Sequence, residues 1–169
     1  LEISEDQGFV NSRTEPASAV PIAFTVTGTD GKKTVYVRAM DAAGNLGPVA
    51  KGSITVDSVV PVLTLKLDGT ATSTRSRDVR LILDARDGGQ VQEMLLWEGA
   101  SPQGASPVAF KDKVTFTVSA SDGEKTISAR VKDAAGNWGA ASSVNVVLDM
   151  TPPTTVVTAV GPKAGKLDV

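Results

Sequence analysis

Residues 122–137 read DGEKTISARVKDAAGN, and residues 30–45 read DGKKTVYVRAMDAAGN. The two stretches lie 92 positions apart, and the same offset aligns Asp57 with Asp149. A fixed offset without gaps indicates a tandem repeat, and this repeat defines the units from which the chain is built. The chain of 169 residues is therefore expected to be built from units of about 92 residues.

Each copy is expected to form one strand between two turns. The Asp-Gly pair at its start suits a tight turn, because glycine tolerates a positive φ. Apolar and polar residues then alternate, so that Ile127 and Val131 share one face of a strand and Arg130 lies on the other. In the closing Asp-Ala-Ala-Gly-Asn, the Asp carboxylate can accept backbone N–H bonds across a turn. A second alternating stretch follows at 53–57 and 143–149, so each copy predicts a β-hairpin.

The segments before each hairpin alternate in the same way, and no window carries a helical period. Strands spaced about ten residues apart, with turn signals between them, predict an antiparallel sandwich. We expect strands at 21–27 in the first unit and at 63–68, 79–84, 91–97 and 114–118 in the second. The predicted core of the second unit is Leu65, Leu81, Leu83, Phe116, Val118, Ile127, Ala129 and Val131.

The repeat predicts three domains of unequal completeness. Residues 1–58 supply strands C to G of an incomplete domain, 59–150 form a complete one, and 151–169 begin a further domain with its strand A. Proline in the short spacers restricts the backbone, so we expect stiff joints and an elongated chain. Because a sheet without strands A and B exposes an apolar face, we expect neither end to be self-sufficient. Either the sequence is a segment of a longer array, or subunits complete one another by strands in trans.

The motif Asp-Gly-x-Lys-Thr…Asp-Ala-Ala-Gly-Asn, followed by Asp and a proline pair, occupies 30–61 and 122–153. The first copy departs from the pattern only in having Val60 before Pro61. The motif resembles the bacterial immunoglobulin-like, fibronectin-III-like tandem repeats of large secreted and cell-surface proteins.

That resemblance implies an all-β fold of tandem immunoglobulin-like antiparallel β-sandwiches. It implies a structural, non-catalytic role, as a rigid spacer, stalk or adhesive region of an extracellular surface protein or filament. The alternative is a carbohydrate-binding accessory module of a secreted hydrolase. The implied partners are neighbouring immunoglobulin-like domains, surface glycans or another cell-surface protein.

Composition excludes several classes of function. The chain has no cysteine and no histidine, which removes the Ser-His-Asp triad, the Cys-His dyad and ordinary zinc sites. A net charge of −2, without a basic run, argues against nucleic-acid binding. No apolar run is long enough to span a membrane in this segment. We therefore expect no enzyme and assign no catalytic, cofactor-binding or metal-binding residue.

Calcium at the domain joints is the one cofactor left open. The turn at 133–137 could offer oxygen ligands, but a turn closed by its own Asp is the simpler interpretation. Asp57 and Asp149 lie at the joints, and one Asp per joint would need help from Asp30, Asp122 or backbone carbonyls to bind calcium. Otherwise each caps the end of a strand.

Trp97, Trp138 and Tyr36 are the aromatic residues that could stack on a sugar ring. Trp97 lies in a predicted strand, where a core tryptophan is common. Trp138 follows the hairpin turn, and we expect it to pack against the neighbouring joint rather than a ligand.

Two charged groups complete the candidates. Asp84 and Asp87 could act as a pair of carboxylates in glycoside hydrolysis, but they are expected to be solvated turn acids. Arg75, Arg77 and Arg80 are expected to protect a solvated edge strand from aggregation.

Overall fold

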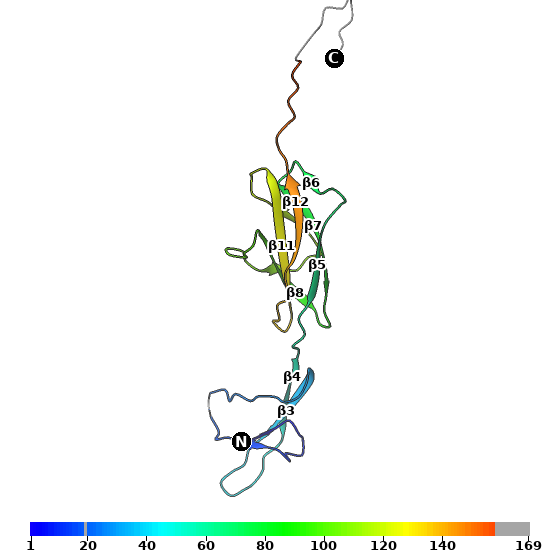
Figure 1. Ribbon diagram of the computed structural model, residues 1–169. Helices are drawn as coiled ribbons and strands as arrows, with labels where there is room; N and C mark the ends of the chain where they lie inside the picture. The colour runs from blue at the N-terminus through cyan, green and yellow to red at the C-terminus, as the bar shows by residue number, and fades with distance from the viewer. Residues whose placement is uncertain (19, 158–169) are drawn as a thin grey trace, which may run out of the picture.

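The computed structural model describes residues 1–18 and 20–157, which contain β-strands and no helix, so the predicted all-β class is confirmed. Figure 1 shows two bodies placed end to end, with the N-terminal one in blue and cyan. The strands are β1 (Glu2–Ser4), β2 (Arg13–Thr14), β3 (Gly31–Arg38), β4 (Ala50–Val56), β5 (Val62–Leu67), β6 (Ser73–Thr74), β7 (Asp78–Arg86), β8 (Val91–Glu98), β9 (Val108–Ala109), β10 (Lys113–Thr117), β11 (Gly123–Asp133) and β12 (Ser142–Leu148).

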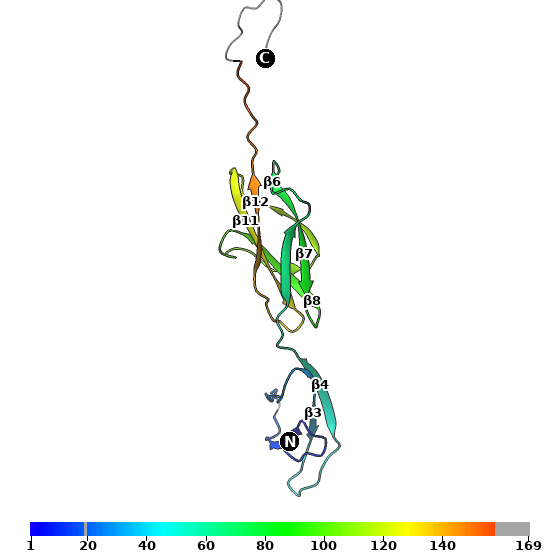
Figure 2. The ribbon, with the colours of Figure 1, turned by 45° about the vertical axis from the view of Figure 1, so that its right-hand side comes forward.

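The second body is a sandwich of two sheets, seen edge-on in Figure 2. One sheet has the order β10-β7-β5 and the other β6-β12-β11-β8-β9. Neighbouring strands are antiparallel except β6 and β12, which are parallel. The two sheets meet where β5 packs against β11 and β12. This arrangement places the start of β5, the β7–β8 turn and the β11–β12 turn at one end of the sandwich.

The core lies between these sheets, on the faces that the alternation predicted. Leu81, Leu83 and Ile127 are almost completely buried, because every second residue of β7 and β11 points inward. Phe116 packs against this cluster but keeps part of its ring exposed, so it lies at the edge of the core. The complete core cluster is Leu63, Leu65, Val79, Leu81, Leu83, Met94, Val118, Ile127, Ala129, Val131, Val146 and Leu148.

The first body contains a single sheet, of order β2-β1-β3-β4, and in residues 1–18 and 20–56 no second sheet faces it. The strand predicted at 21–27 is wrong, because these residues form no strand. Its counterpart β10 pairs with β7, and the first body has no strand equivalent to β7. Its inward face is consequently open: Ile54 is 59% exposed, whereas Val146, at the same place in the repeat, is 2% exposed.

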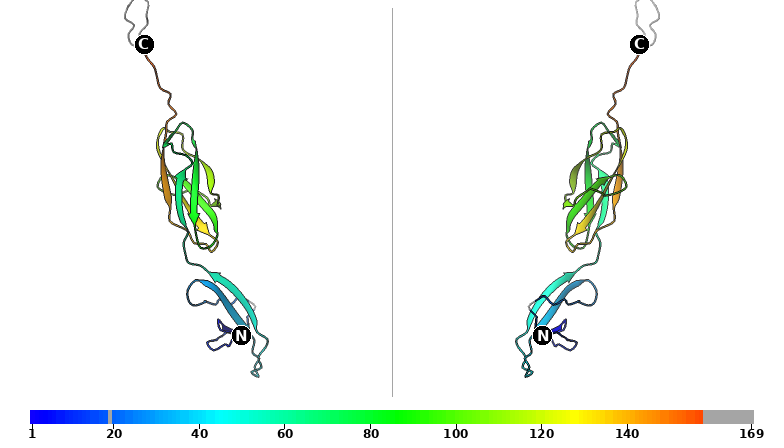
Figure 3. Two further views of the ribbon diagram at one scale, coloured as in Figure 1. Left: turned by 90° about the vertical axis from the view of Figure 1, so that its right-hand side faces the viewer. Right: turned by 90° about the vertical axis from the view of Figure 1, so that its left-hand side faces the viewer.

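The C-terminal segment leaves the sandwich after β12 (Figure 3). Residues 151–157 form no strand. These residues include Val156 and Val157, where strand A was expected, and the rest of the segment predicted to begin a further domain lies outside the described residues. The three-domain division stays a prediction.

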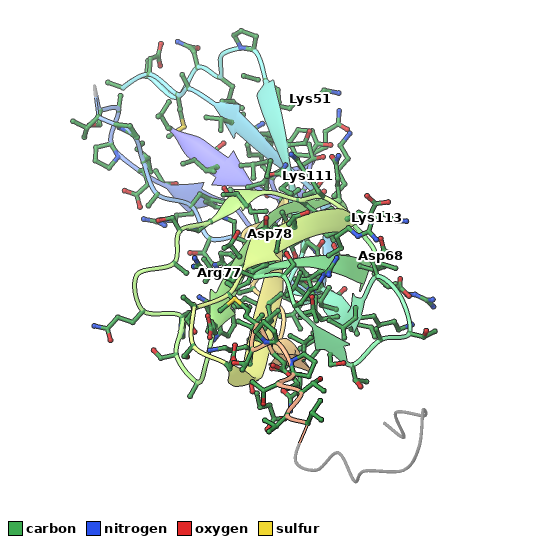
Figure 4. All side chains as sticks on the ribbon, turned by 90° about the horizontal axis from the view of Figure 1, so that it is seen from above. Lys51, Asp68, Arg77, Asp78, Lys111 and Lys113 are labelled. Carbon is green, nitrogen blue, oxygen red and sulfur yellow. The ribbon has the colours of Figure 1, made fainter. Side chains whose placement is uncertain are left out.

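Charges on the outer face of the three-stranded sheet are mixed in sign. Arg80 belongs to β7, which is the central strand of its sheet, so the expected edge strand is wrong. Arg77 donates from Nε to the carbonyl of Val118 at 2.8 Å. Figure 4, viewed from above, shows Asp68 close to Lys113 in this region. Because opposite charges alternate here, this face presents no basic patch.

Candidate metal site at the joint

The joint between the two bodies is a short extended segment whose ends are tied down. Ser58 donates its backbone N–H to Asp30 Oδ2 at 2.9 Å, and its hydroxyl also bonds to that carboxylate. The repeat builds the same tie after β12, where Met150 donates its N–H to Asp122 at 2.9 Å. Asp30 and Asp122 therefore hold the chain that leaves each hairpin.

Asp57 and Asp149 cap the ends of β4 and β12, as one of the two sequence interpretations expected. Asp57 Oδ1 accepts the N–H of Val59 at 3.0 Å, and Asp149 Oδ1 accepts the N–H of Thr151 at 3.1 Å. These bonds turn the backbone toward the following proline. Among the described residues, a folded body follows Asp57, whereas none follows Asp149.

The turn at 133–137 is closed by its own aspartate, as predicted. Asp133 Oδ1 accepts the N–H groups of Gly136 at 2.7 Å and Asn137 at 2.8 Å. Gly136 has a φ of 101°, which a residue with a side chain rarely adopts. The side chain of Asn137 also donates from Nδ2 to the carbonyl oxygens of Asp57 at 2.9 Å and Val59 at 3.3 Å. The turn of the second body thus binds the backbone of the joint.

Gly139 brings this turn into direct contact with the joint. Its N–H donates to the carbonyl of Val131 at 2.9 Å, which fixes the backbone beside β11. A Cβ atom at Gly139 would lie only 2.1 Å from the carbonyl oxygen of Pro61. Only glycine permits this approach, so the start of β5 is seated on the turn of its own sandwich.

Three carboxylates converge at this place. Asp57 comes from the joint, Asp87 from the β7–β8 turn and Asp133 from the β11–β12 turn, and one oxygen of each lies within 4.8 Å of the others. Asp133 is 1% exposed, and the other two are half-buried. The ion pairs found in the described residues involve none of the three.

Asp87 is the residue that sequence reasoning misassigned. Its Oδ2 accepts the N–H of Gly89 at 3.0 Å, but its Oδ1 is buried and has no hydrogen-bond partner among the described residues. Asp84 is exposed, as expected of a solvated acid, and its Oδ1 lies 3.6 Å from Arg86 Nε. Asp87 is therefore not a solvated turn acid.

Burial alone would raise the pKa of Asp133, but hydrogen bonds from Asn137, Gly136 and Ala135 outweigh it and hold this pKa below its ordinary value. The carboxyl is thus ionised at neutral pH. An all-oxygen set of this kind, with no histidine or cysteine, suits a hard cation such as Ca²⁺ rather than zinc.

Comparisons with known proteins address the fold. No family model matches the sequence, and no curated protein matches it. The chain is similar to the fibronectin(III)-like modules of Clostridium thermocellum CbhA, with 18% identity over 87% of this chain and 76% of that chain and a TM-score of 0.50. It is also similar to a tetra-tandem repeat in the extending region of a large adhesion protein, with 22% identity over 72% of this chain and 32% of that chain and a TM-score of 0.41.

The first of these similarities agrees with the repeat motif and with the two-sheet sandwich. The second body therefore has the fold of an immunoglobulin-like, fibronectin-III-like module. The resemblance predicted from the sequence is confirmed as a statement about the fold.

The aromatic residues of these fibronectin-III-like units do not form an exposed row. Trp97 is 8% exposed, so its predicted burial is confirmed, although it pairs with Ser128 outside the main core cluster. Trp138 is half-buried, and its ring lies 4.5 Å from the guanidinium of Arg130 and 5.5 Å from Lys132 Nζ. These contacts place the ring of Trp138 against side chains of β11, and its packing on the joint stays a prediction.

The second fibronectin-III-like unit also contains a buried lysine. Lys125 is 6% exposed and donates from Nζ to the hydroxyls of Ser119 at 2.7 Å and Ser121 at 2.9 Å. Ser119 in turn donates its N–H and its hydroxyl to Glu98, both at 2.7 Å. Burial raises the pKa of Glu98, but the bonds from Ser119 and the charge of Lys125 outweigh it and lower this pKa overall.

This cluster predicts a loss of stability in acid. A carboxyl whose pKa is lowered by folding stabilises the native state above its unfolded pKa of about 4.3, and this contribution disappears as the pH falls through the folded pKa. We expect Glu98→Gln to lower the free energy of unfolding by about 1 kcal/mol at pH 7 and to have little effect near pH 3. Urea unfolding at several pH values would measure the difference in free energy of unfolding between the variant and the wild type. A difference that stays the same from pH 7 to pH 3 would show that Glu98 makes no such contribution.

Proposed function

We propose that the chain is a non-catalytic repeat segment that acts as a rigid spacer or stalk, or as an adhesive region, of an extracellular surface protein or filament. The proposal rests on the contacts that hold the joint between the two bodies. Asn137 binds the backbone on both sides of Ser58, and Gly139 packs against Pro61 with no room for a side chain. A connection held at several points transmits orientation from one unit to the next.

The partners in this proposal are neighbouring units, in the same chain or in an adjacent one. The open face of the first body supports this part, because Val35 and Val37 are only half-buried where Ile127 and Ala129 are fully buried. The extracellular location rests on the resemblance of the repeat motif. Among the described residues there is no helix of the length and apolarity needed to cross a membrane.

The carbohydrate-binding alternative receives less support from the surface. A sugar-binding face presents exposed aromatic rings, whereas Trp97 is buried and Trp138 lies under two cationic side chains. A groove of about 540 Å³ opens beside β10, but Phe116 is its single aromatic lining residue. The spacer role is therefore the one that the geometry favours.

Small-angle X-ray scattering tests the spacer. Strands of seven to nine residues, plus loops, give each unit a length of roughly 35–40 Å. We expect a distance distribution of an elongated particle, with a long axis close to two units placed end to end. Scattering that fits a compact sphere, or two beads on a free hinge, would contradict the proposal.

A matched pair of variants locates the source of the stiffness. Asn45 and Asn137 occupy the same place in the repeat, and each donates from Nδ2 to the Asp of its own turn. Only Asn137 also binds the joint. We expect Asn137→Ala to broaden the distance distribution and Asn45→Ala to leave it unchanged. Equal effects of the two variants would show that the joint is held by other contacts.

A further inference from the structure

We propose that two copies of the chain associate head to tail, with residues 149–157 of one copy docked on the first body of the next. The joint inside each chain is the template for this contact. The repeat places an equivalent donor segment after β12, at 149–157, and an equivalent acceptor turn after β3, at 41–47. The inference rests on the proposed stalk or filament role for its purpose, and on the contacts of the joint for its geometry.

The donor segment leaves β12 held by hydrogen bonds equivalent to those of the joint. Asp149 Oδ1 accepts the N–H of Thr151 at 3.1 Å, and Thr151 Oγ1 donates to Asp122 Oδ2 at 2.6 Å. A similar set of bonds shapes the joint before Pro61. The donor is therefore ordered in advance, so it loses less conformational entropy when it binds.

The acceptor turn of the first body is closed in the same way as the turn that seats the joint in the second body. Asp41 Oδ1 accepts the N–H groups of Ala43 at 2.9 Å and Asn45 at 2.8 Å. Asn45 Nδ2 donates to Asp41 Oδ2 at 2.8 Å, as Asn137 Nδ2 does to its own aspartate at 2.9 Å. The acceptor is thus formed without a segment bound to it.

No segment of the described residues occupies this acceptor turn. Asn137 donates to two carbonyl oxygens of the joint, whereas the side chain of Asn45 donates only within its own turn. A Cβ at Gly139 would lie 2.1 Å from the Pro61 carbonyl oxygen, whereas a Cβ at Gly47 would have its nearest neighbour at 3.6 Å. The first body therefore has the docking features of the second body and leaves them unused.

The repeat offset identifies the segment that fits this turn. At an offset of 92 residues, Asp149, Thr151 and Pro153 correspond to the joint residues that Asn137 and Gly139 contact. The donor segment of a second copy consequently presents its backbone carbonyls and its proline in the order that the acceptor turn recognises.

Beyond the turn, the docked segment continues across the open face of the first body. In the second body, β5 covers the corresponding face of β11 and β12. Val157 has the place of Leu65, which is 5% exposed on the covered side of β5, and Val156 has the place of Thr64, which faces solvent. Val157 is 65% exposed in a single chain, and so is much of Ile54 on the open face. Docking removes both apolar surfaces from water.

The partner is a second copy, because the donor segment and the acceptor turn lie at opposite ends of the elongated chain (Figures 1 and 3). The contact joins two different surfaces, so it is heterologous and can repeat without closing. Head-to-tail association therefore extends the stalk into a filament.

Sedimentation velocity of the whole chain tests this contact. From about 10 μM to about 1 mM chain, the range that reveals interfaces of such weak affinity, we expect the mean mass to rise steadily. At the lowest concentration it should approach the 17.4 kDa of one chain. A wild type that stays monomeric throughout would overturn the proposal and leave the open face to a different partner.

Two neighbouring valines give a matched pair of variants on the donor. Val157→Asp should weaken association at least about tenfold, because it places a carboxylate against an apolar face. Val156→Asp adds the same charge on the solvent side and should leave association unchanged. Both side chains are exposed in a single chain, at 65% and 74%, so neither substitution disturbs its fold. Equal effects of the two variants would refute the strand register.

Gly47→Ala blocks the acceptor instead. The added methyl group has room within its own copy, but it would meet a docked segment as a Cβ at Gly139 would meet Pro61. We expect Gly47→Ala to stay monomeric. Mixed with Val157→Asp, which keeps an intact acceptor, it should form dimers and nothing longer, since the pair has one functional contact. A mixture that stays monomeric, or that forms longer chains, would contradict the head-to-tail contact.

Scattering separates this inference from the spacer itself. An elongated particle whose mass is independent of concentration would remove the contact between copies and leave the spacer. Association in a chain whose two bodies scatter as freely hinged beads would keep the contact and remove the rigid spacer.

Discussion

Replacing Leu81 by alanine is expected to destabilise the second unit by about 3–5 kcal/mol, because a fully buried leucine loses its transfer free energy and leaves a cavity that neighbours cannot fill. Leu81 lies on β7, the central strand of its sheet, and belongs to the main core cluster. The strands on both sides restrict the collapse of the cavity. The melting temperature should fall by more than about 10 °C.

Val62→Ala is the control for this experiment. Val62 belongs to β5 of the same sheet, but its side chain faces solvent and is 65% exposed. A surface substitution of this kind changes stability by no more than about 0.5 kcal/mol. If Leu81→Ala and Val62→Ala had similar effects, the assignment of faces in this sheet would be wrong.

The sequence predicted the hairpin and the core well because both depend on local periodicity. Ile127, Ala129 and Val131 alternate with polar residues, and the structure buries all three completely. It failed at residues 21–27, where the same alternation forms no strand. A strand needs a partner, and the first body has no equivalent of β7. Periodicity describes a candidate strand, but pairing decides whether it forms.

The candidate metal site was harder to predict because its residues are distant in sequence. Asp57 and the turn of Asp133 were both considered, but separately, and Asp87 was assigned to solvent. The order and direction of the strands could have predicted this cluster. One end of an antiparallel sandwich carries the residue before the first strand, the turn after the second strand and the turn of the last hairpin. Because Asp57, Asp87 and Asp133 occupy these three positions, the strand directions predict that they lie at the same end of the sandwich.

The second large effect is expected at Gly139. Replacing Gly139 by alanine would place a methyl carbon 2.1 Å from the carbonyl oxygen of Pro61, so one of the two backbones must move. Forcing extra atoms into a packed site costs typically about 1–3 kcal/mol, and we expect the upper part of this range because the obstructing atom belongs to the main chain. Urea unfolding would measure the loss, and scattering should show a less rigid joint.

Gly47→Ala is a nearly ideal control, because Gly47 has the same place in the first copy of the repeat. Its N–H donates to the carbonyl of Ala39 at 2.9 Å, as that of Gly139 does to Val131. A Cβ at Gly47 would lie 3.6 Å from its nearest neighbour, which is ordinary contact, and neither glycine has a positive φ. Gly47→Ala should therefore change stability by less than about 0.5 kcal/mol, or slightly increase it by restricting the unfolded chain. Since the two substitutions are chemically identical and occupy the same place in the repeat, a larger loss at Gly139 is expected from its contact with the carbonyl oxygen of Pro61. Equal and small effects would mean that Pro61 does not approach the turn in solution, and the rigid connection would lose its main support.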